Sequence, residues 1–139
     1  MSSSEVHASL ARARIARLVT ADRNDSFEVA RDAFRELLLH GAQFVFPAIT
    51  GSLVRGVPTA HAGPAMRDLL IESNEPPPVW PYSEGSARGI ALHPLYPTVP
   101  RAAERDSRLY DALALFDAIR IGRAREREIA SAALTRLLT

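Results

Sequence analysis

The sequence predicts a mainly α-helical protein with a small β component, an α+β fold. Apolar residues recur at helical spacing in several long segments, whereas the β-type runs are short and bounded by glycine and proline. Seven of the ten prolines fall within residues 76–100 and limit regular structure there to brief pieces. Because 47% of the 139 residues are hydrophobic and 24% are charged, the chain is expected to fold around its own core.

Two helices are expected in the N-terminal third. The first lies within the segment 2–19. It opens on serines that can cap a helix, and it is expected to end near Arg17. The second occupies residues 26–40, because Asp25 and Glu28 have the spacing of a capping box and an amphipathic stripe follows. The glycine after this stripe is expected to end the helix in a left-handed turn.

Two more helices are expected at the C-terminus. Asp106 caps the first, Gly122 interrupts the pattern, and the second covers residues 123–138. Their apolar stripes offer more surface than a small body with a proline-rich segment is expected to cover, which predicts a homodimer. The residues of this predicted dimer or partner interface are Leu109, Leu113, Phe116, Leu134, Leu137 and Leu138.

The middle of the chain is expected to hold the β component. Residues 44–46 form a short β-type run, residues 53–54 form another, and the two could pair as a small ribbon. Pro64 then opens a helix of two turns. Residues 76–100 are expected to form an extended strap that packs against the body, because residues such as Trp80 are too apolar for a disordered linker.

The residue types that carry most enzyme chemistry form no recognisable constellation in this sequence. There is no cysteine, the four histidines are widely separated, and neither a nucleophile elbow nor a phosphate-binding glycine loop is present. We therefore expect a non-enzymatic protein without metal or cofactor. The sequence has no apolar run of membrane-spanning length and no signal-peptide layout, so a cytoplasmic location without membrane contact is expected.

The distribution of charge restricts any contact with nucleic acid to a local one. With 17 basic and 16 acidic residues, the net charge of +1 excludes a polycation that coats nucleic acid. Residues 2–19, however, carry Arg12, Arg14 and Arg17 against the single Glu5, a local net charge of +2. The predicted first helix is therefore a candidate contact for phosphate.

Residues 2–19, which read SSSEVHASLARARIARLV, resemble the recognition helix of bacterial winged-helix regulators of the MarR-like group. In that pattern a serine-rich cap opens the helix, apolar residues face the core, and a Leu-Val pair leads into the wing. The residues that match these apolar positions are Val6, Leu10, Ala13, Leu18 and Val19. Arg17 departs from the pattern, in which glycine usually occupies the turn.

The resemblance implies a division of the chain into two parts. Residues 1–23 would be the recognition-helix remnant of a partial winged-helix unit, whose supporting helices would precede residue 1. Residues 24–139 would form a C-terminal helical domain with its proline-rich strap, similar to the uncharacterised region that follows such helices in other bacterial regulators. Because residues 20–26 are short for a wing hairpin, the wing is expected to be reduced or lost.

The function that the resemblance implies is DNA-binding transcriptional regulation. Ser3, Ser4 and His7 are then the candidate contacts to base edges, and Arg12 and Arg14 the candidate contacts to phosphate. Binding by this chain alone is expected to be weak. The alternative is a protein-interaction module, such as the antitoxin of a toxin-antitoxin pair, that binds its toxin through the strap and the C-terminal helices.

Overall fold

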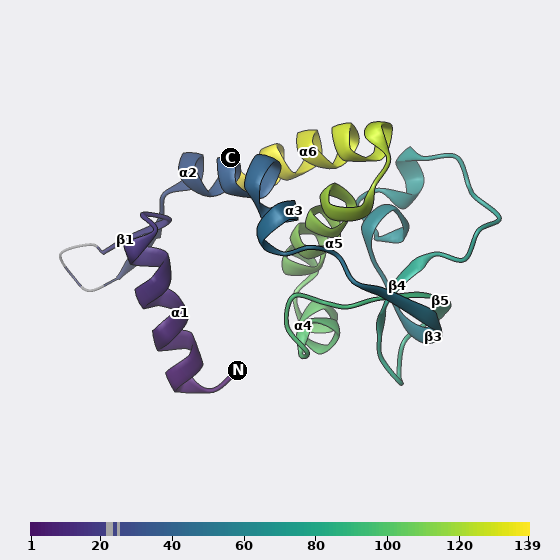
Figure 1. Cartoon of the computed structure of the whole chain (residues 1–139), viewed down its shortest axis with the longest axis horizontal. Coiled ribbons are helices and arrows are strands. Elements are labelled where there is room, and N and C mark those ends of the chain that lie inside the picture. The colour runs from purple at the N-terminus through teal and green to yellow at the C-terminus, as the bar shows by residue number, and fades with distance from the viewer. Residues whose placement is uncertain (22–23, 25) are drawn as a thin grey trace.

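The computed structural model describes residues 1–21, 24 and 26–139, and it has the α+β fold that the sequence predicts (Figure 1). The N-terminal elements are α1 (Ser3–Ile15), β1 (Val19–Ala21), β2 (Phe27–Val29), α2 (Arg31–Glu36), the π-helical turn η1 (Leu37–Gly41) and α3 (Ala42–Val45). The remaining elements are β3 (Thr50–Pro58), the short turns η2 (Ala60–Ala62) and η3 (Arg67–Leu69), β4 (Pro78–Pro81), β5 (Ala87–Leu92), α4 (Val99–Arg105), α5 (Ser107–Ile121) and α6 (Ala124–Leu138).

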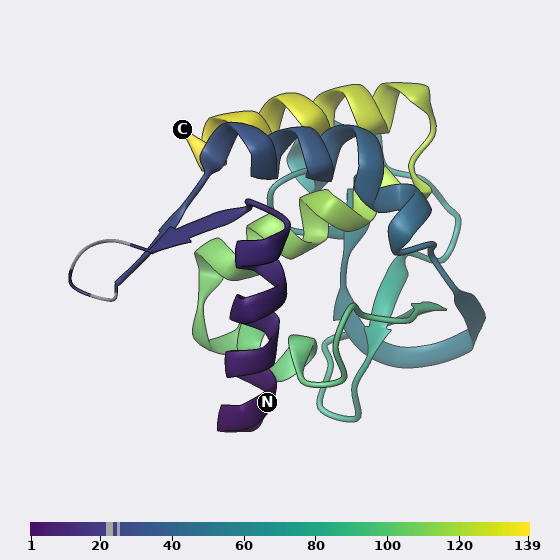
Figure 2. The same cartoon turned by 60° about the vertical axis from the view of Figure 1, so that its left-hand side comes forward.

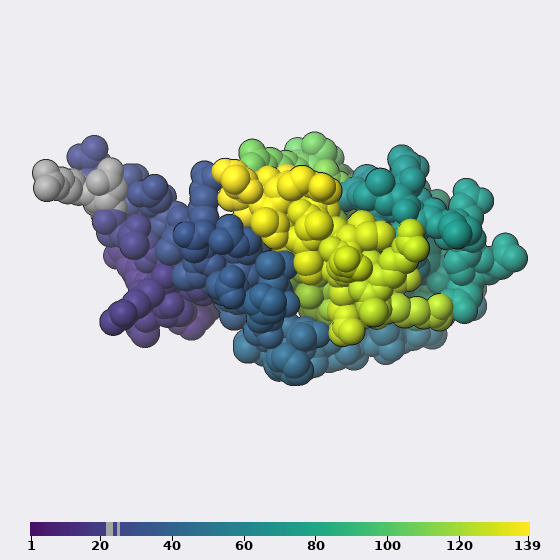
Figure 3. All heavy atoms as spheres, turned by 90° about the horizontal axis from the view of Figure 1, so that it is seen from above, coloured from purple at the N-terminus to yellow at the C-terminus, as the bar shows by residue number. Residues whose placement is uncertain are grey.

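The N-terminal residues 1–29, which we call the arm, lie at one end of the molecule (Figures 1 and 3). Ser2 caps α1 in a capping box with Glu5, as the serine-rich start predicts. β1 and β2 then pair antiparallel in a hairpin, with Val19 opposite Val29. No residue of α1, β1 or β2 is buried.

The helix expected over residues 26–40 starts later than predicted. Residues 27–29 form β2, and the helix begins at Arg31. Phe27 fits the helical stripe by spacing, but pairing of this segment with β1 satisfies its backbone groups and determines the structure. Asp25, the predicted cap, lies outside the described residues.

β1 and β2 form a short antiparallel hairpin in the part of the chain where a reduced or lost wing is expected. It has three residue pairs, from Val19 opposite Val29 to Ala21 opposite Phe27. The boundary expected after residue 23 falls at a residue outside the described part of the chain, and the hairpin lies on both sides of it.

A continuous helical run from α2 through η1 to α3 follows the arm and lies along α6 (Figures 2 and 3). The predicted left-handed stop at Gly41 does not form, because Gly41 has a φ of −108° and the run passes through it as a π-helical turn. As a result Phe44 and Val45 belong to α3, and the ribbon expected between residues 44–46 and 53–54 is absent.

β3, β4 and β5 form a small closed sheet in which each strand pairs with the other two. β3 is antiparallel to both neighbours, and β4 and β5 are parallel. The backbones approach closely, since a Cβ atom on Gly56 would overlap the carbonyl group of Trp80. The segment 76–100 packs inward as predicted, with Val79 and Trp80 buried, although it contains two strands and the start of α4.

α5 lies at the centre of the body, in contact with α4, α6 and η2. It begins and ends as predicted, because the Asp106 side chain accepts a hydrogen bond of 3.0 Å from the Leu109 N–H and Gly122 follows its last residue. The two-turn helix expected after Pro64 is only the short turn η3. Among the described residues, none of the helices has both the length and the apolar character needed to span a bilayer.

Candidate nucleic-acid interface

A tight turn at Arg17 joins α1 to the hairpin. Arg17 has a φ of 58°, the left-handed conformation that favours glycine. The N–H of Leu18 donates to the Ala13 carbonyl and the N–H of Arg17 to the Arg14 carbonyl, each over 2.9 Å, which is the Schellman pattern of helix ends. These bonds set the direction in which the hairpin leaves α1.

One side of α1 carries a strip of mostly small side chains that faces solvent. At about 100° of rotation per residue, positions 4, 8, 11 and 15 fall on one line along the helix. The residues of this strip are Ser4, Ala8, Ala11 and Ile15, and all four are exposed. The opposite side carries Leu10 and Ala13, which are partly buried. Small side chains at three of these positions leave the α1 backbone accessible to close approach.

The two arginines predicted to contact phosphate lie on opposite flanks of this strip. Arg12 and Arg14 are two positions apart, which separates their side chains by about 200° around the helix. Both are exposed. Arg12 donates a 3.1 Å hydrogen bond to the Ser9 hydroxyl, and the Arg14 guanidinium lies 4.7 Å from the centre of the Phe27 ring. Positive charge therefore borders the strip on both sides.

The three predicted base-contacting residues are exposed near the start of α1. Ser4 belongs to the strip itself. Ser3 and His7 lie on the flank that also carries Arg14, because residues 3, 7 and 14 fall within about 40° of one another around the helix. The structure therefore brings His7 and Arg14 to one flank and leaves Arg12 on the other.

Glu5 is the one acidic residue of α1, and its carboxylate is held by two neighbours. Oε2 accepts a 2.6 Å hydrogen bond from the Ser2 N–H, and Oε1 accepts a 3.0 Å bond from the Tyr96 hydroxyl. The bond from the Ser2 backbone is the largest cause that lowers the pKa of Glu5. The hydrogen bond between the Tyr96 hydroxyl and the Glu5 carboxylate raises the pKa of Tyr96. The Glu5 charge is thus engaged in the helix cap and in a link to the body.

The leucines and phenylalanine predicted at a dimer interface are used largely inside the monomer. Phe116 and Leu134 are buried, with 3% and 1% of their surface exposed. Leu113, Leu137 and Leu138 are half-buried against the two core clusters, and Leu109 is 40% exposed. α5 and α6 pack against each other and against neighbouring elements, so most of the apolar surface of their stripes is already covered.

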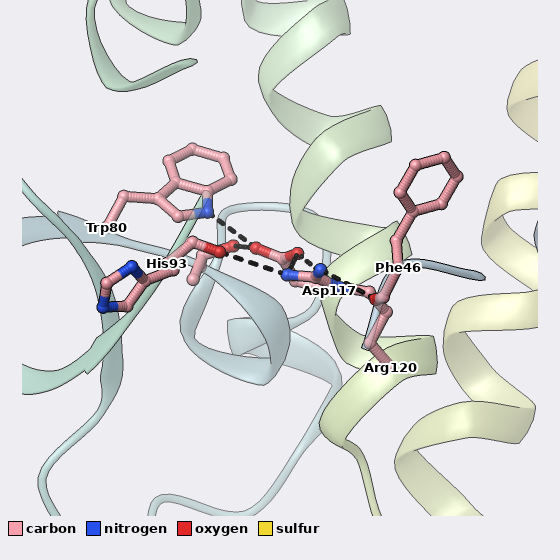
Figure 4. A network of polar contacts seen from close by, with 6 residues as sticks. Phe46, Trp80, His93, Asp117 and Arg120 are labelled. Atoms are coloured by element: carbon pink, nitrogen blue, oxygen red, sulfur yellow. Dashed lines mark hydrogen bonds and ion pairs between the residues drawn. The ribbon is translucent and has the colours of Figure 1, made fainter. Parts of the chain in front are cut away.

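A buried polar network that the sequence analysis missed centres on Asp117 of α5 (Figure 4). Its Oδ2 accepts hydrogen bonds from the Thr59 hydroxyl at 2.8 Å and from the indole N–H of Trp80 at 2.6 Å. Its Oδ1 lies 2.9 Å from a guanidinium nitrogen of Arg120. Burial raises the pKa of Asp117, against the lowering effect of Arg120 and of the hydrogen-bond donors.

Arg120 extends the network to two further segments of the chain. Its guanidinium donates to the backbone carbonyls of Phe46, at 3.0 Å, and His93, at 3.3 Å. Within the described residues, every fully buried polar side-chain atom has a hydrogen-bond partner. Because the donors and acceptors are matched, the network acts as a clamp between α5 and the sheet. The spacing of Asp117 and Arg120 on one helix was its only sequence signal, since Thr59 and Trp80 are distant in sequence.

No group of three histidine or acidic side chains in the part of the chain that the structure describes lies close enough together to hold a metal ion. A shallow depression of about 300 Å³ lies between α5 and α6, with Asp111 and Arg136 among its lining residues. The other lining residues are alanines and leucines, so the Asp111 carboxylate has no nucleophile or second acid beside it among them.

Comparison with known proteins gives no match: neither a family model, nor a curated protein, nor a solved structure corresponds to this chain. The interpretation of the arm therefore depends on its own geometry and charge.

Proposed function

We propose that this chain is a DNA-binding protein of the winged-helix regulator type, in which α1 enters the major groove and the β1–β2 hairpin is the wing. The observation that carries the proposal is the exposed strip of α1, bordered by Arg12 and Arg14 and followed directly by a hairpin. A helix of about 10–12 Å in diameter fits the major groove, whose phosphates lie on both sides of it.

The strip gives each predicted contact a place in this arrangement. Ala8 and Ala11 allow the helix backbone to approach the base edges closely, and Ile15 supplies an apolar contact of the kind that suits a thymine methyl group. Ser3, Ser4 and His7 supply hydrogen-bonding groups near the start of α1, where recognition helices contact bases. Arg12 and Arg14 then reach phosphates on opposite sides of the groove.

The charge of the chain makes this a weak binder of limited footprint. The net charge is +1, and few arginines lie on the arm, so two or three phosphate contacts per chain are expected. The proposed role is regulatory and non-enzymatic, and it places the protein in the cytoplasm, where bacterial DNA is found.

A protein-interaction module, such as an antitoxin, is the second candidate. The observation that favours it is the apolar surface of the arm, where Val6, Phe27 and Val29 are between 43% and 46% exposed. Such side chains suit a protein partner better than a phosphate backbone. A neighbouring reading frame that resembles a toxin would support this candidate.

The test of DNA binding introduces a carboxylate into the strip. Fluorescence anisotropy of the full chain with labelled DNA from upstream of its own gene, at low salt, measures the binding. Ala8→Glu should abolish binding, because the new charge faces the bases and phosphates. Ala132→Glu, the same change at an exposed alanine of α6, is the matched control and should bind like the wild type. Failure of the wild type to bind, or equal binding by Ala8→Glu, would refute the proposal.

A further inference from the structure

A second exposed surface, apolar in character, lies on the body away from the strip. It follows a single stretch of chain from α3 into the start of β3, and we call it the α3–β3 patch. Its residues and exposed fractions are Phe44 (78%), Val45 (62%), Phe46 (46%), Ile49 (59%) and Leu53 (47%). In Figure 3 the blue segment that contains α3 and the start of β3 forms a surface ridge beside α6.

The backbone beneath the patch is held in place, so its exposure is a feature of the folded protein. The Phe46 carbonyl accepts the hydrogen bond from Arg120, and the Ile49 carbonyl accepts a 2.9 Å bond from the His93 N–H. Figure 4 shows the Phe46 ring directed away from the Asp117 network, on the far side of its own carbonyl. The buried clamp therefore fixes the segment while its side chains project outward.

The composition of the patch indicates what kind of partner it fits. Residues 41–54 contain no aspartate, glutamate, lysine or arginine, although 24% of the whole chain is charged. Such a surface has no positive charge with which to bind phosphate. A charged protein partner would have to bury its charges there without counter-charges. An uncharged apolar surface, by contrast, can face a copy of itself across a two-fold axis without repulsion between like charges.

The edge of β3 beside the patch is also open to pairing with a second copy of the chain. Between Thr50 and Val54, β3 is paired only with β5 among the described strands, because β4 joins it from Gly56 onward. A partly open edge beside apolar side chains is a common site of strand association. In an antiparallel pairing of two copies, residues on one side of the axis face residues on the other side, so both copies use the same edge.

We propose that the α3–β3 patch is the interface of a two-fold symmetric homodimer. Its two phenylalanines alone expose on the order of 250 Å². A standard interface buries about 800 Å² per partner, so the flanking residues must contribute and the dimer should form at micromolar concentrations. Dimerisation itself does not depend on DNA binding. If the proposed function also holds, the dimer presents two arms, which suits an operator with inverted half-sites.

Sedimentation velocity of the full chain without DNA tests the proposal. The wild type should shift from a 15.2 kDa monomer toward a dimer as its concentration rises through the micromolar range. Phe44→Asp should remain monomeric, because dimerisation would bury the introduced charge in an apolar interface without a counter-charge. Ile71→Asp alters a residue that is 98% exposed on a loop outside the patch and should associate like the wild type. Circular dichroism verifies that all three proteins are folded.

Cross-linking provides a measurement that does not depend on disrupting the patch. The chain has no cysteine, so single cysteines at positions 44, 45, 49 and 53 can be oxidised one at a time. At least one of them should give a disulfide-linked dimer, whereas Ile71→Cys should not. A wild type that stays monomeric, a Phe44→Asp variant that associates equally well, or failure of all four positions to cross-link would overturn the proposal.

Discussion

The indole N–H of Trp80 donates a 2.6 Å hydrogen bond to the carboxylate of Asp117, and this bond connects strand β4 to helix α5. Both residues are buried, with 1% and 2% of their surface exposed. The same carboxylate accepts a hydrogen bond from Thr59 and pairs with Arg120. Arg120 in turn binds the carbonyls of Phe46 and His93, so these two side chains of α5 together connect it to four other segments of the body. This arrangement positions the backbone beneath the α3–β3 patch.

Asp117→Asn should destabilise the protein by about 3 kcal/mol, because it leaves the buried Arg120 guanidinium without its counter-charge. Urea unfolding followed by the fluorescence of Trp80, the single tryptophan, measures the change. Asp68→Asn is the control, since that side chain is 85% exposed, and it should change the free energy of unfolding by less than about 0.5 kcal/mol. Equal urea midpoints for the two variants would show that the clamp contributes little.

The start of α1 should respond to acid through Glu5. Because folding lowers the pKa of Glu5, its ionised carboxylate stabilises the cap above the ordinary value of about 4.5, and this contribution is lost as the pH falls through the lowered pKa. NMR shifts of the α1 amides should therefore show a step below about pH 4.5 that Glu5→Gln removes. An identical step in Glu5→Gln would assign the change to another group.

Arg17→Gly should stabilise the junction between α1 and the hairpin by about 0.5–1 kcal/mol, because glycine adopts the left-handed conformation without strain. Hydrogen exchange at the Leu18 amide, which closes the turn by bonding to the Ala13 carbonyl, reports this junction directly. Slower exchange in Arg17→Gly is expected. Arg17→Ala is the comparison, and it should not slow exchange because alanine meets the same strain.

Local signals in the sequence predicted much of the helical structure. Ser2, Asp106 and Gly122 act on the residues next to them, and each has the predicted role in the structure. The failures concern segments whose structure depends on partners elsewhere. Phe27 fits a helical stripe, yet it pairs with β1, and Phe44 has the residue type of a strand, yet the helical run continues through it.

In the candidate site, too, features set by neighbouring residues could be predicted from the sequence, whereas contacts between residues far apart in the sequence could not. The exposure of Ser4, His7 and Arg12 along one helix follows from helical periodicity and can be read from sequence. The hairpin that accompanies α1 depends on pairing between Val19–Ala21 and Phe27–Val29, and the sequence between them carries no strong hairpin signal. The Asp117 clamp could not be anticipated, because Trp80 and Asp117 are brought together only by the completed fold.

The salt dependence of DNA binding tests the central claim most directly. Anisotropy titrations of the full chain at increasing salt should give a slope of log affinity against log salt of roughly −2 to −3, since each phosphate contact contributes about 0.9. Arg12→Ala and Arg14→Ala should each make the slope shallower by about one unit. Arg125→Ala, at an exposed position on α6, should leave it unchanged. Slopes that are identical in the wild type and both α1 variants, or a loss in Arg125→Ala as large as in those variants, would contradict the account.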